Sequence, residues 1–338
     1  MKKYNVVWLF IDGVRRYHST PDQIEQGDDR SRLDFMDEFA LDAVELKNVM
    51  TSAPSTFMSL SAMVSGMPSY YINRNFDDFI FDNGKIPSLT NELINNNYNP
   101  YCFLMHKDTR EKLLNIFPMI DRKYWPTNLS HNMYWSNDNI SEAVINILKV
   151  GVKEPSFFFV DYNCREDKEI SNKVKNILNV FRSHGYTSDN TITILCSDHG
   201  YPDSSKDEGR PEFYIKNNLG HDLVLTDDNV MIPMFIQYPD CPKGKKIETC
   251  VSSIDLYPTI LDLINYKSIH TLSITGKSWL PLINEDNDYK LMMENRYHRC
   301  DNRFAFQTGK GTVIRNGKYK YIYYHGEKIG GGEPEEFF

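Results

Sequence analysis

The chain has 338 residues, of which 41% are hydrophobic and 25% charged, an ordinary globular composition that excludes a disordered or fibrous protein. Its 38 Lys and Arg against 46 Asp and Glu give a formal charge of −8, which argues against a nucleic-acid or anionic-membrane binder. No apolar run approaches the ~18 residues of a membrane span. The first apolar run, residues 6–11, leaves no room for a signal peptide, so the sequence predicts a cytoplasmic protein.

Short apolar runs and amphipathic stretches alternate along the chain. Four runs of strand length predict buried strands at residues 6–11, 156–160, 191–196 and 231–237. Helical spacing of apolar residues predicts helices at residues 86–96, 139–150 and 170–184. Strands without polar alternation, separated by such helices, indicate an α/β fold with a mostly parallel central sheet and helices on both faces.

The pattern of apolar residues changes near residue 285. Residues 309–324 alternate like a β-hairpin with a turn at Asn316-Gly317, which predicts a small C-terminal antiparallel β subdomain at 285–338. Residues 1–284 would then form the larger α/β domain. The polar segment 201–218 is expected to be a long surface loop. The six cysteines are scattered without a CxxC pair, which predicts buried thiols rather than disulfides or a zinc cluster.

Two candidate metal-binding segments follow predicted strands. Asp12 ends the first strand, and Asp198-His199-Gly200 follows the third. Since ligands collect beyond the carboxyl ends of parallel strands, we expect Asp12, Asp198 and His199 to share one edge of the sheet. Carboxylates and imidazoles are ligands for Zn²⁺ or Mn²⁺. The alternative is that Asp12 caps a helix and the Asp-His-Gly segment only forms a turn.

A third candidate is Thr56, which opens a short apolar helix closed by Gly66. The free N–H groups and the positive dipole of a helix N-terminus favour an anion or an ionised hydroxyl. A hydroxyl placed there and touching a metal is an activated nucleophile. The alternative is a plain N-cap.

In this order, Asp12, Thr56 and Asp198-His199-Gly200 resemble the alkaline phosphatase/sulfatase superfamily. Its sulfatase branch has a nucleophile helix written C/S-x-P-x-R, followed by an apolar stretch and T-G. Counting back from Ser65-Gly66 places Thr56 in the nucleophile slot and Ser59 in the family's Ser slot.

Later segments resemble family motifs in the family's order. They are Gly220-His221 as G-H, 228–233 as the acidic lead into V-P-L, 252–263 as V-D-L-x-P-T-L-L-D-L, 275–282 as D-G-x-S-L-L-P-L, 313–322 as R-x-G-x-Y-K-Y-I, and 335–338 as the start of E-L-Y-D-L. The resemblance thus spans nearly the whole chain. The sequence ends inside the last of these motifs, which leaves two alternatives, a short family member or a truncated chain.

The resemblance implies a divalent metal ion (Zn, Mn, Mg or Ca) held by Asp12, Asp198, His199 and the hydroxyl of Thr56, with Thr56 as nucleophile. His221 would bind a second metal or the substrate anion and protonate the leaving group. The other candidates for binding a second metal or the substrate are Asp161, Cys164, Arg165, Glu166 and His106. The alternative for His106 is that it is an ordinary surface histidine.

The chain departs from the sulfatase pattern at three places. Thr56 is neither Cys nor Ser, so the formylglycine that sulfatases make from those residues cannot form. Leu60 fills the family's Arg slot, and residues 161–166 lack the His of the binuclear branches. A threonine with Asp, Asp and His is instead similar to the phosphodiesterase and lipoteichoic-acid-synthase-like branches, which transfer phosphoryl groups.

The sequence therefore predicts a metal-dependent hydrolase or transferase of phosphate esters that acts through a covalent threonine intermediate. Its partner would be an anionic ester, which is glycan-linked, lipid-linked or small. One alternative is a sulfatase that uses unmodified threonine. Another, of a different class, is a degenerate member that binds an anion or glycan without turnover.

Overall fold

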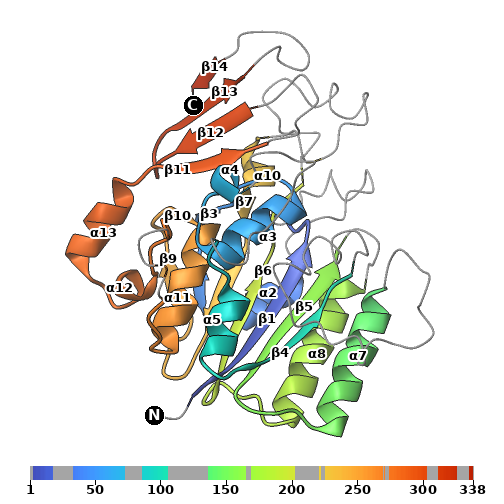
Figure 1. The fold of residues 1–338 in the computed structure, drawn as a ribbon. Helices are drawn as coiled ribbons and strands as arrows, with labels where there is room; N and C mark the ends of the chain where they lie inside the picture. The colour runs from blue at the N-terminus through green and yellow to red at the C-terminus, as the bar shows by residue number, and fades with distance from the viewer. Residues whose placement is uncertain are drawn as a thin grey trace.

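The computed structural model describes residues 3–17, 33–72, 86–105, 136–164, 169–201, 221, 225–268, 270, 274–302, 311–325 and 335–337. Within these residues, seven strands form a central sheet in the order β4-β5-β1-β6-β8-β2-β9 (Figure 1). Their bounds are Asn99–Phe103 (β4), Ser156–Asn163 (β5), Asn5–Asp12 (β1), Thr191–Cys196 (β6), Met234–Gln237 (β8), Val44–Leu46 (β2) and Lys246–Ile247 (β9). The four strands β4, β5, β1 and β6 are parallel, which confirms the predicted α/β class.

The central strands are buried on both faces, as their unbroken apolar sequences predict. In β1, Val6, Trp8 and Phe10 pack into one core, while Val7, Leu9 and Ile11 pack into the other. Successive side chains of a strand point to opposite faces, so an apolar residue at every position is what a two-sided core requires.

Helices cover each face of this sheet (Figure 1). One core includes residues of α2 (Asp34–Ala40), α7 (Asn137–Val150) and α8 (Ile170–Ser183). The other includes residues of α3 (Thr56–Ser65), α5 (Leu89–Asn95) and α11 (Leu256–Leu263). The predicted helices therefore form, with ends shifted by a few residues. The other helices of the described residues are α4 (Ser69–Ile72), α10 (Asp227–Val230), η3 (Ser253–Asp255), α12 (Leu280–Ile283) and α13 (Asn287–Glu294).

The predicted strand at 231–237 is wrong in two respects. It is split into β7 (Met231–Ile232) and β8, with Pro233 between them. Proline has no N–H to donate to a strand ladder, which explains the break. In addition, β8 is antiparallel to β6, and β7 belongs to a separate sheet with β3 (Val49–Met50) and β10 (Val251–Ser252).

The C-terminal part contains a four-stranded antiparallel sheet of β11 (His298–Asp301), β12 (Gly311–Arg315), β13 (Lys320–Tyr324) and β14 (Glu335–Phe337). This confirms the predicted hairpin, but its turn has four residues, 316–319. The Oδ1 of Asn316 accepts hydrogen bonds from the backbone N–H groups of Lys318 and Tyr319, which closes this wider turn. The boundary at residue 285 stays a prediction.

All six cysteines are free and five are buried, as predicted. Within the described part of the chain, no helix combines the length and apolar character that crossing a membrane requires.

Candidate metal centre and nucleophile

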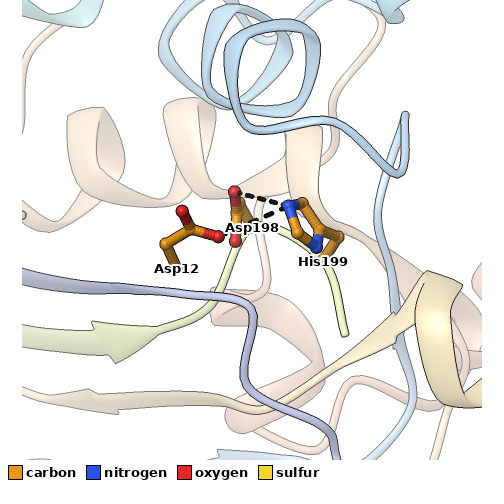
Figure 2. A group of neighbouring side chains, drawn as sticks. All are labelled: Asp12, Asp198 and His199. Carbon is orange, nitrogen blue, oxygen red and sulfur yellow. Dashed lines mark ion pairs between the residues drawn. The ribbon is translucent and has the colours of Figure 1, made fainter. Parts of the chain in front are cut away.

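Parallel pairing of β1 with β6 brings the predicted metal ligands together. Phe10 pairs with Cys196, so Asp12 and Asp198 each lie two residues beyond the same point of the ladder. Figure 2 shows both carboxylates and His199 converging at this edge of the sheet. The ligand atoms of the three residues all lie within 4.8 Å of one another, and all three residues are buried.

The imidazole of His199 is oriented toward the two carboxylates. Its Nδ1 lies 2.7 Å from the carbonyl oxygen of Gly200, which can only accept, so Nδ1 donates and carries the proton. In the neutral ring, Nε2 then keeps its lone pair. Nε2 lies 3.5 Å from Oδ1 of Asp12 and 3.2 Å from Oδ2 of Asp198. A backbone carbonyl that orients the far nitrogen in this way is typical of metal-binding histidines.

The donor set fits a divalent cation. Two carboxylates and one imidazole are ligands that Zn²⁺ and Mn²⁺ accept. The buried Oδ2 of Asp198 accepts no hydrogen bond from the described residues, while Oδ1 accepts one from the N–H of Gly13 at 3.1 Å. A buried carboxylate oxygen without such a donor is costly unless a cation lies beside it.

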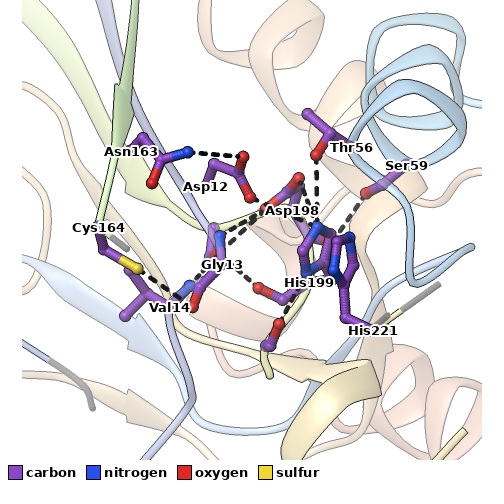
Figure 3. Close-up of polar contacts among 12 residues, drawn as sticks. Asp12, Gly13, Val14, Thr56, Ser59, Asn163, Cys164, Asp198, His199 and His221 are labelled. Carbon is purple, nitrogen blue, oxygen red and sulfur yellow. Dashed lines mark hydrogen bonds and ion pairs between the residues drawn. The ribbon is translucent and has the colours of Figure 1, made fainter. Parts of the chain in front are cut away.

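Thr56 lies at the first position of α3, directly beside these ligands (Figure 3). Its Oγ1 is 3.4 Å from Nε2 of His199. The helix ends at Gly66, whose φ of 66° is the left-handed conformation that glycine adopts most readily, so the predicted helix boundaries are confirmed. The nucleophile candidate therefore lies where unpaired backbone N–H groups and the helix dipole favour negative charge.

Glycine is required at position 200 by close packing of the backbone. The N–H of Gly200 donates to the carbonyl oxygen of Asn229 at 2.7 Å, which holds the chain after His199 against α10. A Cβ at this position would clash with the carbonyl oxygen of Asp228. The Asp-His-Gly motif thus combines two candidate ligands with the residue that permits their loop to pack.

The candidates for a second metal do not join the first group in the described part of the chain. The Oδ2 of Asp161 accepts a hydrogen bond from the N–H of Met105 at 3.0 Å. The thiol of Cys164 donates to the carbonyl oxygen of Gly13 at 3.2 Å, so it supports the Asp12 loop. Arg165, Glu166 and His106 lie outside the described residues.

His221 does reach the site. Its ring stacks on the ring of His199, with centroids 4.0 Å apart and an interplanar angle of 17° (Figure 3). The carbonyl oxygen of His221 accepts a hydrogen bond from the side chain of Asn229 at 2.7 Å, which connects this residue to α10. The structure therefore brings together Asp12, Thr56, Asp198, His199 and His221.

Asn163 contacts the site but was not predicted. Its Nδ2 lies 3.4 Å from Oδ2 of Asp12, on the side away from His199 (Figure 3). Asn137 brackets its backbone, donating to the carbonyl oxygen at 2.8 Å and accepting from the N–H at 3.0 Å. The pairing of β1 with β5, which places Asn163 opposite Asp12, is the feature that could have identified Asn163 as a site residue.

Two family models match the chain. The one described as Sulfatase matches residues 173–266, and the one described as N-sulphoglucosamine sulphohydrolase, C-terminal, matches residues 222–330. Arylsulfatase K of Canis lupus familiaris is 27% identical over 143 residues, which are 40% of this chain and 23% of that protein. A sulfatase of Formosa agariphila is 31% identical over 105 residues, 31% of this chain and 16% of that protein. The chain thus spans less than a quarter of either relative.

Solved structures share the fold over the whole chain. A putative sulfatase from Bacteroides thetaiotaomicron has a TM-score of 0.72 at 15% identity, covering 100% of this chain and 85% of that one. A phosphonate monoester hydrolase from Silicibacter pomeroyi has a TM-score of 0.70 at 12% identity, covering 99% and 89%. These likenesses confirm the predicted fold. The two family models support the predicted resemblance.

Proposed function

We propose that the chain is a metal-dependent hydrolase of anionic esters in the alkaline phosphatase/sulfatase superfamily, with Thr56 as its nucleophile. The observation that carries the proposal is the convergence of Asp12, Asp198 and His199 beside the hydroxyl of Thr56. A non-catalytic anion binder does not need a hydroxyl aligned with three metal ligands at a helix N-terminus.

The reaction we propose is substitution at phosphorus. A divalent cation held by Asp12, Asp198 and His199 would lower the pKa of the Thr56 hydroxyl and offset charge on the ester. Oγ1 of Thr56, having lost its proton to solvent, forms a bond to phosphorus while the bond to the leaving oxygen breaks. His221 in its protonated form donates a proton to that oxygen. Water, or an acceptor alcohol in a transferase, then releases phosphate from Thr56.

Phosphate esters are the first choice of substrate because of the residue in the nucleophile position. Threonine lacks the primary hydroxyl or thiol from which formylglycine is made, so the reaction requires an unmodified alkoxide. The structural likeness to a protein named as a phosphonate monoester hydrolase supports this choice.

Sulfate esters are the second candidate. The relatives that match in sequence are named arylsulfatase K and sulfatase, and both family models describe sulfatases. The metal ligands and Thr56 would act on sulfur in the same roles.

Trapping the covalent intermediate tests both candidates. The metal-loaded protein is mixed with p-nitrophenyl phosphate or p-nitrophenyl sulfate, quenched in acid, digested and analysed by high-resolution mass spectrometry. We expect phosphate on the peptide that contains Thr56, and none in Thr56→Ala. A sulfate adduct in place of phosphate would reverse the substrate choice, and turnover without any adduct on Thr56 would exclude it as nucleophile.

A further inference from the structure

Besides the contact of Thr56 with His199, a buried hydroxyl ties the nucleophile helix to the metal-ligand loop. Ser59 lies one turn after Thr56 in α3 and is fully buried. Its Oγ donates to the backbone carbonyl oxygen of Asp198 at 2.9 Å (Figure 3). The contact joins two segments that are 139 residues apart in the chain, one carrying the nucleophile and the other carrying two ligands.

The direction of the hydrogen bond between Ser59 and Asp198 follows from the chemistry of its acceptor. The carbonyl oxygen of Asp198 has no proton, so Ser59 must be the donor. Thr51 Oγ1 lies 2.8 Å from Ser59 Oγ, and it also donates to the carbonyl oxygen of Ala53 at 3.0 Å. Ser59 therefore contacts both the loop before α3 and the ligand loop.

We propose that Ser59 is a positioning residue that sets the distance between Thr56 and the metal ligands; this inference rests on the proposed function. A helical turn is rigid, so a displacement at Ser59 is transmitted to Thr56 three residues earlier. The Oγ1 of Thr56 lies 3.4 Å from Nε2 of His199, and the Ser59 hydrogen bond keeps α3 at that separation. Reaction rates depend steeply on such distances, since a misplacement of about 1 Å costs on the order of 100-fold.

Ser61 provides a matched control in the same helix. It is also fully buried, and its Oγ donates to the carbonyl oxygen of Phe57, one turn back within α3. Replacing Ser61 by alanine removes a hydroxyl of the same kind without touching the ligand loop. If the loss of any buried hydroxyl from α3 lowered activity, Ser59→Ala and Ser61→Ala would lose activity to the same extent.

The test compares full-length, metal-loaded wild type with Ser59→Ala, Ser59→Cys and Ser61→Ala. Cysteine keeps the volume of the side chain but is a weak donor, so it separates packing from hydrogen bonding. We expect kcat to fall about 10- to 100-fold in both Ser59 variants, with KM and metal affinity changed by less than about threefold. Ser61→Ala should stay within about twofold of wild type.

Orthovanadate binding, followed by vanadium NMR, gives a readout that needs no substrate, because vanadate imitates the phosphoryl-transfer transition state. Its affinity should fall in Ser59→Ala and Thr56→Ala but not in Ser61→Ala. Equal behaviour of the Ser59 and Ser61 variants, or a metal affinity that falls in step with kcat, would overturn the positioning role alone. A wild type with neither turnover nor vanadate binding would overturn the proposed function, and the role of Ser59 with it.

Discussion

Asp198 uses its two carboxylate oxygens for different tasks. Oδ1 accepts the hydrogen bond from Gly13 that fixes the end of β1, and Oδ2 faces Nε2 of His199. In Asp198→Asn the shape and the Gly13 contact survive, while the negative charge is lost. We predict that affinity for Zn²⁺ or Mn²⁺ falls by at least about 10- to 100-fold, measured by competition with a metal indicator.

The control for this variant is Asp189→Asn, which removes an exposed carboxylate from the loop before β6. It should bind metal like wild type. Equal affinities for wild type and Asp198→Asn would exclude this carboxylate as a ligand.

Gly200 gives a second prediction for a single residue. A methyl group there would clash with the carbonyl oxygen of Asp228, a backbone atom that cannot turn aside. Gly200→Ala should destabilise the fold by about 1–3 kcal/mol in denaturant unfolding and also weaken metal binding, because the loop moves with His199. A variant as stable as wild type would show that the contact with α10 is loose.

Single residues were predictable where a motif carries them. Asp12 ends a strand, Thr56 opens a helix, and Asp198-His199 come directly after the end of another strand. Such positions are visible in the pattern of the chain. Ser59 and Asn163 were not assigned to the site, because their roles depend on which backbone atoms lie opposite them. Strand register and helix docking determine that, and one sequence does not display either.

At the scale of elements, β11 begins with an unusual buried group. The side chain of His298 is only 2% exposed. Burial lowers the pKa of His298 from 6.5 to about 4, so the folded protein holds this ring neutral. The strand that joins the C-terminal sheet to the rest of the molecule thus contains a group that resists protonation.

This pKa predicts acid sensitivity with a definite sign. Below pH 6.5 the unfolded chain protonates His298 while the folded chain does not, so stability falls as pH drops from 6.5 toward 4. The loss from this group alone amounts to about 3 kcal/mol at pH 4. In urea unfolding, His298→Phe should be less sensitive to pH over this interval, whereas His184→Gln, at an exposed position, should follow wild type. An unchanged slope in His298→Phe would contradict the prediction.

The elements themselves were predicted where apolar runs are long enough to show a period. The stripe of α8 and the unbroken run of β1 belong to this class. The two-residue strands β3, β7, β9 and β10 are too short to show any pattern. The direction of β8 could not be predicted either, because a short apolar run has the same sequence pattern in a parallel and in an antiparallel strand pair.

At the scale of the whole molecule, the net charge of −8 does not determine whether the site binds an anionic substrate. Exposed charges more than about 10 Å apart are largely screened at ordinary salt concentrations. A bound cation and the N-terminus of α3 would set the local field where an ester binds. The acidic composition therefore argues against broad polyanion binding and leaves a small anionic ester compatible with the fold.

Metal binding should also stabilise the whole fold, because its proposed ligands come from both β1 and the segment after β6. A ligand present at 100 times its Kd adds about 2.7 kcal/mol. We predict that chelation lowers Tm by several degrees, that Zn²⁺ or Mn²⁺ restores it, and that Asp198→Asn shows neither change. Identical melting of chelated and metal-loaded wild type would contradict a site that joins these strands.

The most direct test of the account is the turnover of p-nitrophenyl phosphate, bis-p-nitrophenyl phosphate and p-nitrophenyl sulfate by metal-loaded wild type and Thr56→Ala. The account predicts that wild type hydrolyses a phosphate ester faster than the sulfate, and that Thr56→Ala loses at least about 1,000-fold in kcat while still binding metal. Turnover by Thr56→Ala at the wild-type rate, or metal-loaded wild type inert toward all three esters, would contradict it.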